Sequence, residues 1–143
     1  MSKTNPDSIL ELYRQFDKVF KKPDSFFNQG CCVEKKDEKY LLNTDRKTIS
    51  EEPLSHAFNH YRNCFGNFEQ LGYYLPRLIE IARDNKGDLG YCISFWSLLK
   101  EDKPKYKELN LLPCLLTALE EIYSSTEDDE YQRDWKEFKR PID

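Results

Sequence analysis

Apolar residues recur every three or four positions along most of the chain, and this spacing predicts a succession of helices. The first helix is expected over residues 6–22, because Pro6 suits a first helical turn and Pro23 ends the pattern. A loop over 23–33 and a short helix over 34–42 follow. The alternating pattern of a half-buried strand does not stand out anywhere, so the sequence predicts an all-α fold.

Further helices are predicted after position 50. Ser50 can cap a helix that carries an apolar stripe to Tyr61, and the next stripe runs from about residue 67 to Ala82. Pro76 lies inside that second stripe, so we expect a kink or two abutting helices there. The remaining elements are expected to be a loop over 84–90, a short helix over 91–99, a polar link over 101–107, a helix over 108–123, a loop over 124–129 and a last short helix with Tyr131, Trp135 and Phe138.

The motif Leu-Pro-x-Leu occurs twice, beginning at Leu75 and Leu112, 37 positions apart. A proline loses least at the start of a helix, and an apolar stripe follows it in both copies. A period near 40 residues is typical of stacked helix-pair repeats. We therefore expect one domain over residues 1–143 with six or seven helices, loosely HEAT-like in its second half, and such arrays usually bind other molecules.

Charge is unevenly distributed along the chain. The segment from Glu120 to the end has nine acidic and four basic residues, whereas the whole chain has a net charge of −4. The body is therefore about neutral and the C-terminal segment is acidic. Nucleic acid is not expected as a partner, because its phosphates need a basic face. A basic protein fits this charge distribution, although an acidic segment can also be simply a solvated surface.

From the sequence we expect a cytoplasmic protein. No stretch approaches 18 consecutive apolar residues, so no membrane span and no membrane partner are expected. The first residues lack the basic-then-apolar layout of a signal peptide. The five cysteines are odd in number and widely spread, which favours free thiols in a reducing compartment.

Four residues could in principle form a metal or thiol site. Cys31 and Cys32 are adjacent, and His56 and His60 have the spacing that places two histidines on one helix face. Adjacent cysteines are awkward ligands for one ion, and the spacing matches no common zinc finger. The alternative is that all four residues pack or face solvent. No glycine-rich phosphate loop is present, and neither a resident cofactor nor a catalytic set is expected.

Aromatic residues, arginine and carboxylates supply candidates for a protein interface. Adjacent tyrosines on a helix cannot both face the core, and aromatic residues and arginine are favoured at protein interfaces. The alternative is that the aromatic side chains simply cover a small core. The candidate partner-binding residues are Tyr73, Arg77, Asp128, Asp129, Glu130, Tyr131 and Trp135.

The segment from Phe26 to Ile81, about 40% of the chain, resembles a family of small bacterial proteins known mainly as hypothetical proteins. That family has a Cys-Pro-Cys-Cys motif, matched here by residues 29–32, and a stretch of the form TTWGDxxDFxxFLPR. The second stretch aligns without gaps and keeps the residues Gly66, Leu75, Pro76 and Arg77. The chain departs from the family at Gln29, Phe65, Asn67 and Gln70, which replace a cysteine, a tryptophan and two acids. The resemblance implies a shared helical fold and brings no activity.

These features together lead us to expect a protein-binding module and no enzyme. Its most concrete form is an immunity protein that binds and blocks a co-encoded, basic toxin domain through the acidic segment and aromatic anchors. The alternatives are a metal- or thiol-dependent enzyme that uses the cysteine and histidine pairs, and a helical adaptor in a larger assembly. The sequence leaves the oligomeric state open.

Overall fold

N-terminal capping residues and first-turn prolines explain where most of the helices begin. The structure is a computed structural model that describes residues 7–28, 35–61 and 65–141. Asp7 caps α1 (Ser8–Asp17), because its carboxylate accepts a hydrogen bond from the Ile9 amide at 2.9 Å. Asn67 caps α4 (Phe68–Gly72) in the same way, and Asp128 caps α8 (Asp129–Phe138). The prolines of both Leu-Pro motifs lie in the first turns of α5 (Leu75–Asp84) and α7 (Leu112–Tyr123), as predicted.

The described residues form eight α-helices and no strand, so the all-α prediction is confirmed. The other elements are α2 (Lys35–Asn43), the 3₁₀ turn η1 (Arg46–Thr48), α3 (Glu51–Asn59) and α6 (Phe95–Glu108). None of the described helices is both long and apolar enough to cross a membrane.

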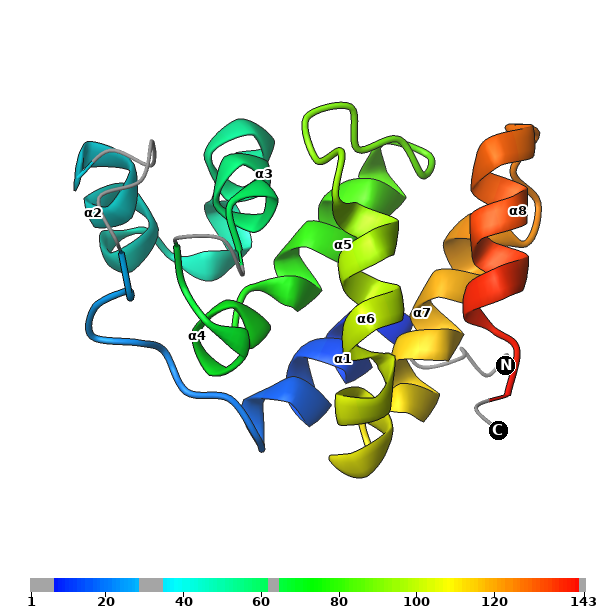
Figure 1. Cartoon of the computed structure of the whole chain (residues 1–143), viewed down its shortest axis with the longest axis horizontal. Helices are drawn as coiled ribbons and strands as arrows, with labels where there is room; N and C mark the ends of the chain where they lie inside the picture. The colour runs from blue at the N-terminus through cyan, green and yellow to red at the C-terminus, as the bar shows by residue number, and fades with distance from the viewer. Residues whose placement is uncertain (1–6, 29–34, 62–64, 142–143) are drawn as a thin grey trace, which may run out of the picture.

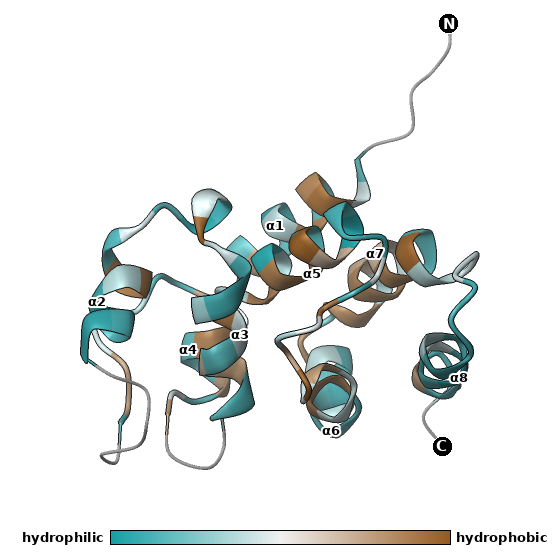
Figure 2. Cartoon of the chain, turned by 90° about the horizontal axis from the view of Figure 1, so that it is seen from above, coloured by the Kyte–Doolittle hydropathy of each residue, from teal (hydrophilic) through white to brown (hydrophobic). Residues whose placement is uncertain are grey.

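Helices α1, α5 and α7 pack against one another at the centre of the molecule. Helices α3 and α4 cover one side of α5, with α2 outside α3, whereas α6 and α8 pack on α7 and on each other (Figure 1). Figure 2 shows that the brown, hydrophobic residues are concentrated on α5 and α7, while α2 and α8 are mostly hydrophilic. The core therefore lies between the repeated Leu-Pro helices and α1. The predicted HEAT-like pairing of the second half stays a prediction.

The structure corrects the predicted boundaries in the second half of the chain. Residues 101–107, predicted as a polar link, belong to α6 even though Pro104 lies inside this helix. An interior proline costs about 3 kcal/mol. Burial of Leu99 and Tyr106 offsets this cost, because a buried large side chain contributes about 1.5–3 kcal/mol. The Tyr106 ring lies 5.4 Å from that of Phe68, between centroids.

Two further boundaries differ from the prediction. The helix predicted over 108–123 is interrupted because Asn110 adopts a left-handed conformation with φ of 61°, which asparagine tolerates better than most residues. The first helix ends at Asp17 rather than at residue 22. Two helices, α4 and α5, meet near Pro76 as expected.

Candidate functional site

The N-terminal end of α8 holds most of the predicted partner-binding residues. Asp129 and Glu130 are exposed, and Asp128 is exposed while its carboxylate accepts from the Tyr131 amide at 3.0 Å. Tyr131 is half-buried, and its hydroxyl donates to Asp88 Oδ1 at 3.1 Å. This bond ties α8 to the loop that connects α5 with α6. Burial, helped by the bond to Asp88, raises the pKa of Tyr131 to about 12, so the hydroxyl stays protonated at neutral pH.

The loop over residues 85–94 presents two large apolar side chains to solvent. Ile93 is 87% exposed and Tyr91 is 57% exposed. The sequence pattern predicts these residues as part of a helix over 91–99, whereas α6 begins only at Phe95 and residues 91–94 belong to the loop. The signal that could have found it is Gly90, which precedes these residues and favours a turn.

Side chains of α3 hold this loop in place. The Asn59 amide group donates to the Tyr91 carbonyl at 2.8 Å and accepts from the Ser94 amide at 3.2 Å. At the other end of α3, the Glu51 carboxylate accepts from the Asn85 side chain at 3.1 Å and from the Tyr91 amide at 3.4 Å. The loop conformation is therefore set by residues far away in the sequence.

Two surface hollows border the loop, and both have acidic walls. The hollow toward α8 is lined by Glu130 and Asp134 together with Ile93 and aromatic side chains. The hollow toward α3 is lined by Glu51, Asp84, Asp88, Tyr91 and one base, Lys86, among others. We name this region the loop–α8 surface, and we define it by Glu51, Asp84, Asp88, Tyr91, Ile93, Glu127, Asp129, Glu130, Tyr131 and Asp134.

Some carboxylates of the loop–α8 surface have basic partners of their own. Asp134 pairs with Lys100 at 2.9 Å, and Asp84 lies 3.5 Å from Arg83. Lys86 is the only base that lines either hollow among the described residues, against five carboxylates. The surface is therefore negatively charged around its exposed apolar side chains, even after these pairs are counted.

Trp135 does not belong to this exposed surface. Its side chain is only 3% exposed and lies in the core, although it is on the same helix as Glu130. Acidic and buried residues recur on opposite faces of α8 with the helical period. Predicted partner-binding residues that are close in the sequence therefore face opposite ways.

Tyr73 caps the end of α4 and Arg77 lies in the first turn of α5, whereas the loop follows the end of α5, about 15 Å away along a ten-residue helix. The Arg46 guanidinium lies over the ring of Tyr73, 4.1 Å from its centroid, and donates to the Tyr73 carbonyl at 2.8 Å. Arg46 also forms an ion pair with Asp17 at 2.9 Å. These contacts join η1 to α1 and to the junction of α4 with α5.

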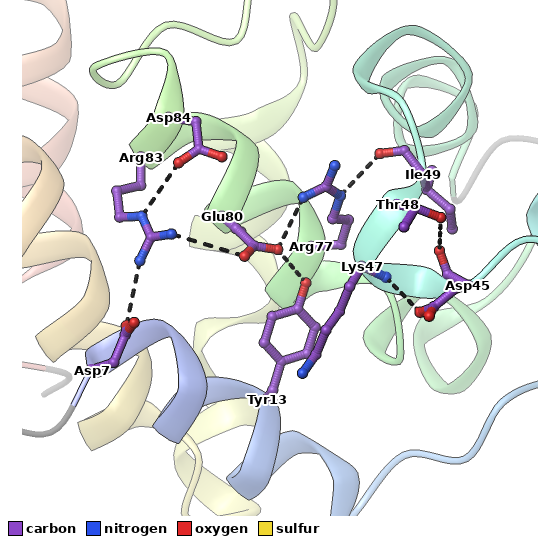
Figure 3. Close-up of polar contacts among 10 residues, drawn as sticks. All are labelled: Asp7, Tyr13, Asp45, Lys47, Thr48, Ile49, Arg77, Glu80, Arg83 and Asp84. Carbon is purple, nitrogen blue, oxygen red and sulfur yellow. Dashed lines mark hydrogen bonds and ion pairs between the residues drawn. The ribbon is translucent and has the colours of Figure 1, made fainter.

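Arg77 belongs to a second polar network (Figure 3). Its guanidinium donates to the Ile49 carbonyl at 2.9 Å and to Glu80 at 3.0 Å. The hydroxyl of Tyr13, on α1, reaches the same Glu80 oxygen at 2.6 Å, and burial together with this bond raises the pKa of Tyr13. Arg83 extends the network to Asp7 at 3.3 Å. The structure thus uses Tyr73 and Arg77 to hold helices together and does not bring them to the α8 candidates.

The metal and thiol candidates are only partly described. Cys31, Cys32 and Cys64 lie outside the described residues. His56 and His60 lie on one side of α3 with ring centroids 4.7 Å apart, and burial lowers the pKa of His60, with His56 adding to the effect. Within the described ranges, no group of three or more histidines, cysteines and carboxylates could hold a metal ion.

The two described cysteines are poor nucleophiles. Burial raises the pKa of Cys92 to about 12 and that of Cys114 to about 11, so both thiols are protonated at neutral pH. The thiolate is the nucleophilic form of cysteine, and neither Cys92 nor Cys114 is a thiolate at neutral pH.

No protein-family model, curated protein or solved structure matches this chain. The resemblance of residues 26–81 to small bacterial proteins therefore stays a prediction. The candidate site rests on the chain's own geometry alone.

Proposed function

We propose that the chain is a protein-binding module that recognises a basic partner through the loop–α8 surface. The observation that carries this proposal is the exposure of Tyr91 and Ile93 between two acid-walled hollows. Exposed apolar side chains within a polar rim are typical of protein interaction sites. The carboxylates would attract a basic partner over a distance of about a Debye length, and the apolar side chains would contribute affinity after contact.

In its most concrete form, the proposal is an immunity protein that covers the surface of a basic toxin domain and so blocks its activity. The acidic surface supports this role. Electrostatic attraction speeds association, which a toxin inhibitor needs, and salt weakens it.

Affinity capture with matched charge variants tests the binding proposal. The tagged chain is used as bait in a lysate of the organism that encodes it, beside the variant Glu127→Lys/Glu130→Lys. The control Glu69→Lys/Glu108→Lys makes the same change in net charge on α4 and at the end of α6. Asp128 is left unchanged, because its capping bond stabilises α8 by about 1 kcal/mol.

We expect the wild type and the control variant to capture one stoichiometric basic protein. The variant Glu127→Lys/Glu130→Lys should not capture it. A captured protein that all three baits retain equally, or no specific protein at all, would refute the proposal.

The immunity role is then tested by growth. The captured protein expressed alone should stop growth, and coexpression of the chain should restore it. A non-toxic partner would leave a binding module of another kind, such as an adaptor.

A further inference from the structure

Ile93 is the most exposed large apolar residue among those described, and the backbone on both sides of it is hydrogen-bonded to α3. The Asn59 side chain bonds to the backbone of Tyr91 and of Ser94, the residues that flank Cys92 and Ile93. Cys92 between them is buried, so the loop is fixed on both sides while Ile93 points to solvent. An anchor held in this way loses little conformational entropy on binding.

The surroundings of Ile93 combine apolar and acidic character. Ile93 forms one edge of the hollow toward α8, whose lining includes Trp96 and Tyr131 as well as Glu130 and Asp134. On the other side of the loop, Asp88 lies beside the second acidic hollow. A ligand that covers Ile93 would therefore meet aromatic surface next to it and carboxylates around it.

We propose that Ile93 is the central anchor of the loop–α8 surface and that its occupant is a basic, amphipathic segment of a partner protein. This inference rests on the proposed function and names the chemistry of the partner. Apolar side chains of the segment pack around Ile93 and in the hollow toward α8, and its lysines or arginines face the carboxylates. A second copy of this chain is a poorer occupant, because it would place the same acidic rim against itself.

Anchors at the centre of an interface contribute far more to affinity than the contacts around them. Replacing Ile93 by aspartate should therefore weaken binding by at least about tenfold, since it removes the apolar contact and would bury a carboxylate at the centre of the interface. Leu10 on α1 is 56% exposed and offers a matched control outside the loop–α8 surface, because Leu10→Asp makes the same type of change elsewhere.

The probe is a phage-displayed library of random short peptides, selected on the immobilised wild-type chain. Enriched peptides are synthesised with a fluorescent label, and their dissociation constants are measured by anisotropy against the wild type, Ile93→Asp, Leu10→Asp and Glu127→Lys/Glu130→Lys. We expect peptides that carry lysine or arginine beside leucine or aromatic residues. We also expect a loss of at least about tenfold for Ile93→Asp, with no change for Leu10→Asp.

The outcomes separate the anchor from the proposed function. Peptides that lose affinity for the charge variant and keep it for Ile93→Asp would refute the anchor and leave the proposed function standing. Peptides indifferent to both variants, or the absence of any enriched peptide, would count against both. Size-exclusion chromatography adds a further test, because a wild-type dimer that Ile93→Asp converts to a monomer would assign the anchor to self-association and overturn the proposal.

Discussion

Gly72, the last residue of α4, lies directly against the ring of Phe20, and replacing it by alanine tests how the chain after α1 packs on α4. A Cβ atom at position 72 would lie 2.4 Å from Cε1 and 2.5 Å from Cζ of Phe20. Carbon atoms in contact rest about 3.5 Å or more apart, so the ring would have to move by about 1 Å. Phe20 is buried, and its ring lies 5.5 Å from Phe16 and 5.4 Å from Phe68 between centroids, which leaves it little room.

Two effects of Gly72→Ala oppose each other. Alanine in place of glycine stabilises a helix by up to about 1 kcal/mol, and by less at the last helical residue. Overpacking of a tightly packed core costs about 1–3 kcal/mol. Because the clash involves a confined ring rather than the end of a flexible side chain, we expect the steric cost to dominate. The free energy of unfolding should fall by about 1–2 kcal/mol.

Urea denaturation followed by tryptophan fluorescence measures this change, since Trp96 and Trp135 are both buried in the core. Gly90→Ala is the control, because the nearest atom to its added Cβ would be Asp88 Oδ1 at an ordinary contact distance of 3.7 Å. Its stability should stay within about 0.5 kcal/mol of the wild type.

The effect should also shrink in a Phe20→Leu background, where the smaller side chain relieves the clash. A Gly72→Ala protein as stable as the wild type would show that Phe20 can move aside without cost. An equal loss of stability in the Phe20→Leu background would refute the reasoning.

Three further predictions concern stability. Tyr13→Phe removes the 2.6 Å hydrogen bond to the Glu80 carboxylate and should lower the free energy of unfolding by about 1.5–3 kcal/mol in urea, the usual range for a bond to a charged group. Asp128→Ala removes the cap of α8 and should lower it by about 1 kcal/mol, whereas the neighbouring Asp129→Ala should change it much less. Burial raises the pKa of Cys92 and of Tyr131 to about 12 in the folded chain, from 9.0 and 10.0, so the folded state holds these protons more tightly than the unfolded state. The stability from these two groups should be complete below pH 9 and should be lost as the pH rises toward 12, which urea titrations at successive alkaline pH values would measure.

Each of these predictions has a contradicting result. An unchanged urea midpoint for Tyr13→Phe would show that water replaces the bond to Glu80. Equal losses for Asp128→Ala and Asp129→Ala would deny the capping role, and stability that rises between pH 9 and 12 would reverse the sign argued from burial.

Local patterns in the sequence determined the helical class and most helix starts. A proline in a first turn and a capping aspartate or asparagine act on backbone groups within one helical turn, so they can be recognised without knowing any neighbour. This is why α5, α7 and the abutment of α4 with α5 were predictable. The acidic character of the α8 end was likewise readable, because charge is a property of composition.

The tertiary structure decided which of those elements continue and which side chains stay exposed. Residues 101–107 are helical because the burial of Tyr106 and Leu99 in the core outweighs the local cost of Pro104. Residues 91–94 are not helical because Asn59, 32 positions before Tyr91, bonds to their backbone. Such bonds join residues that only folding brings together, so no local pattern reveals them.

The candidate site shows the same division. Glu130 and Trp135 are close in the sequence, and both were predicted as interface residues. In the structure Glu130 is exposed and Trp135 is buried, because α6 and α7 cover only one face of α8. Ile93 looks like a core residue in the sequence and lies 87% exposed in the fold. The helices could be predicted because they depend on near neighbours, and the sign of the charge because it depends on composition. The tertiary structure alone determined the binding surface, since exposure depends on which distant segments cover each face.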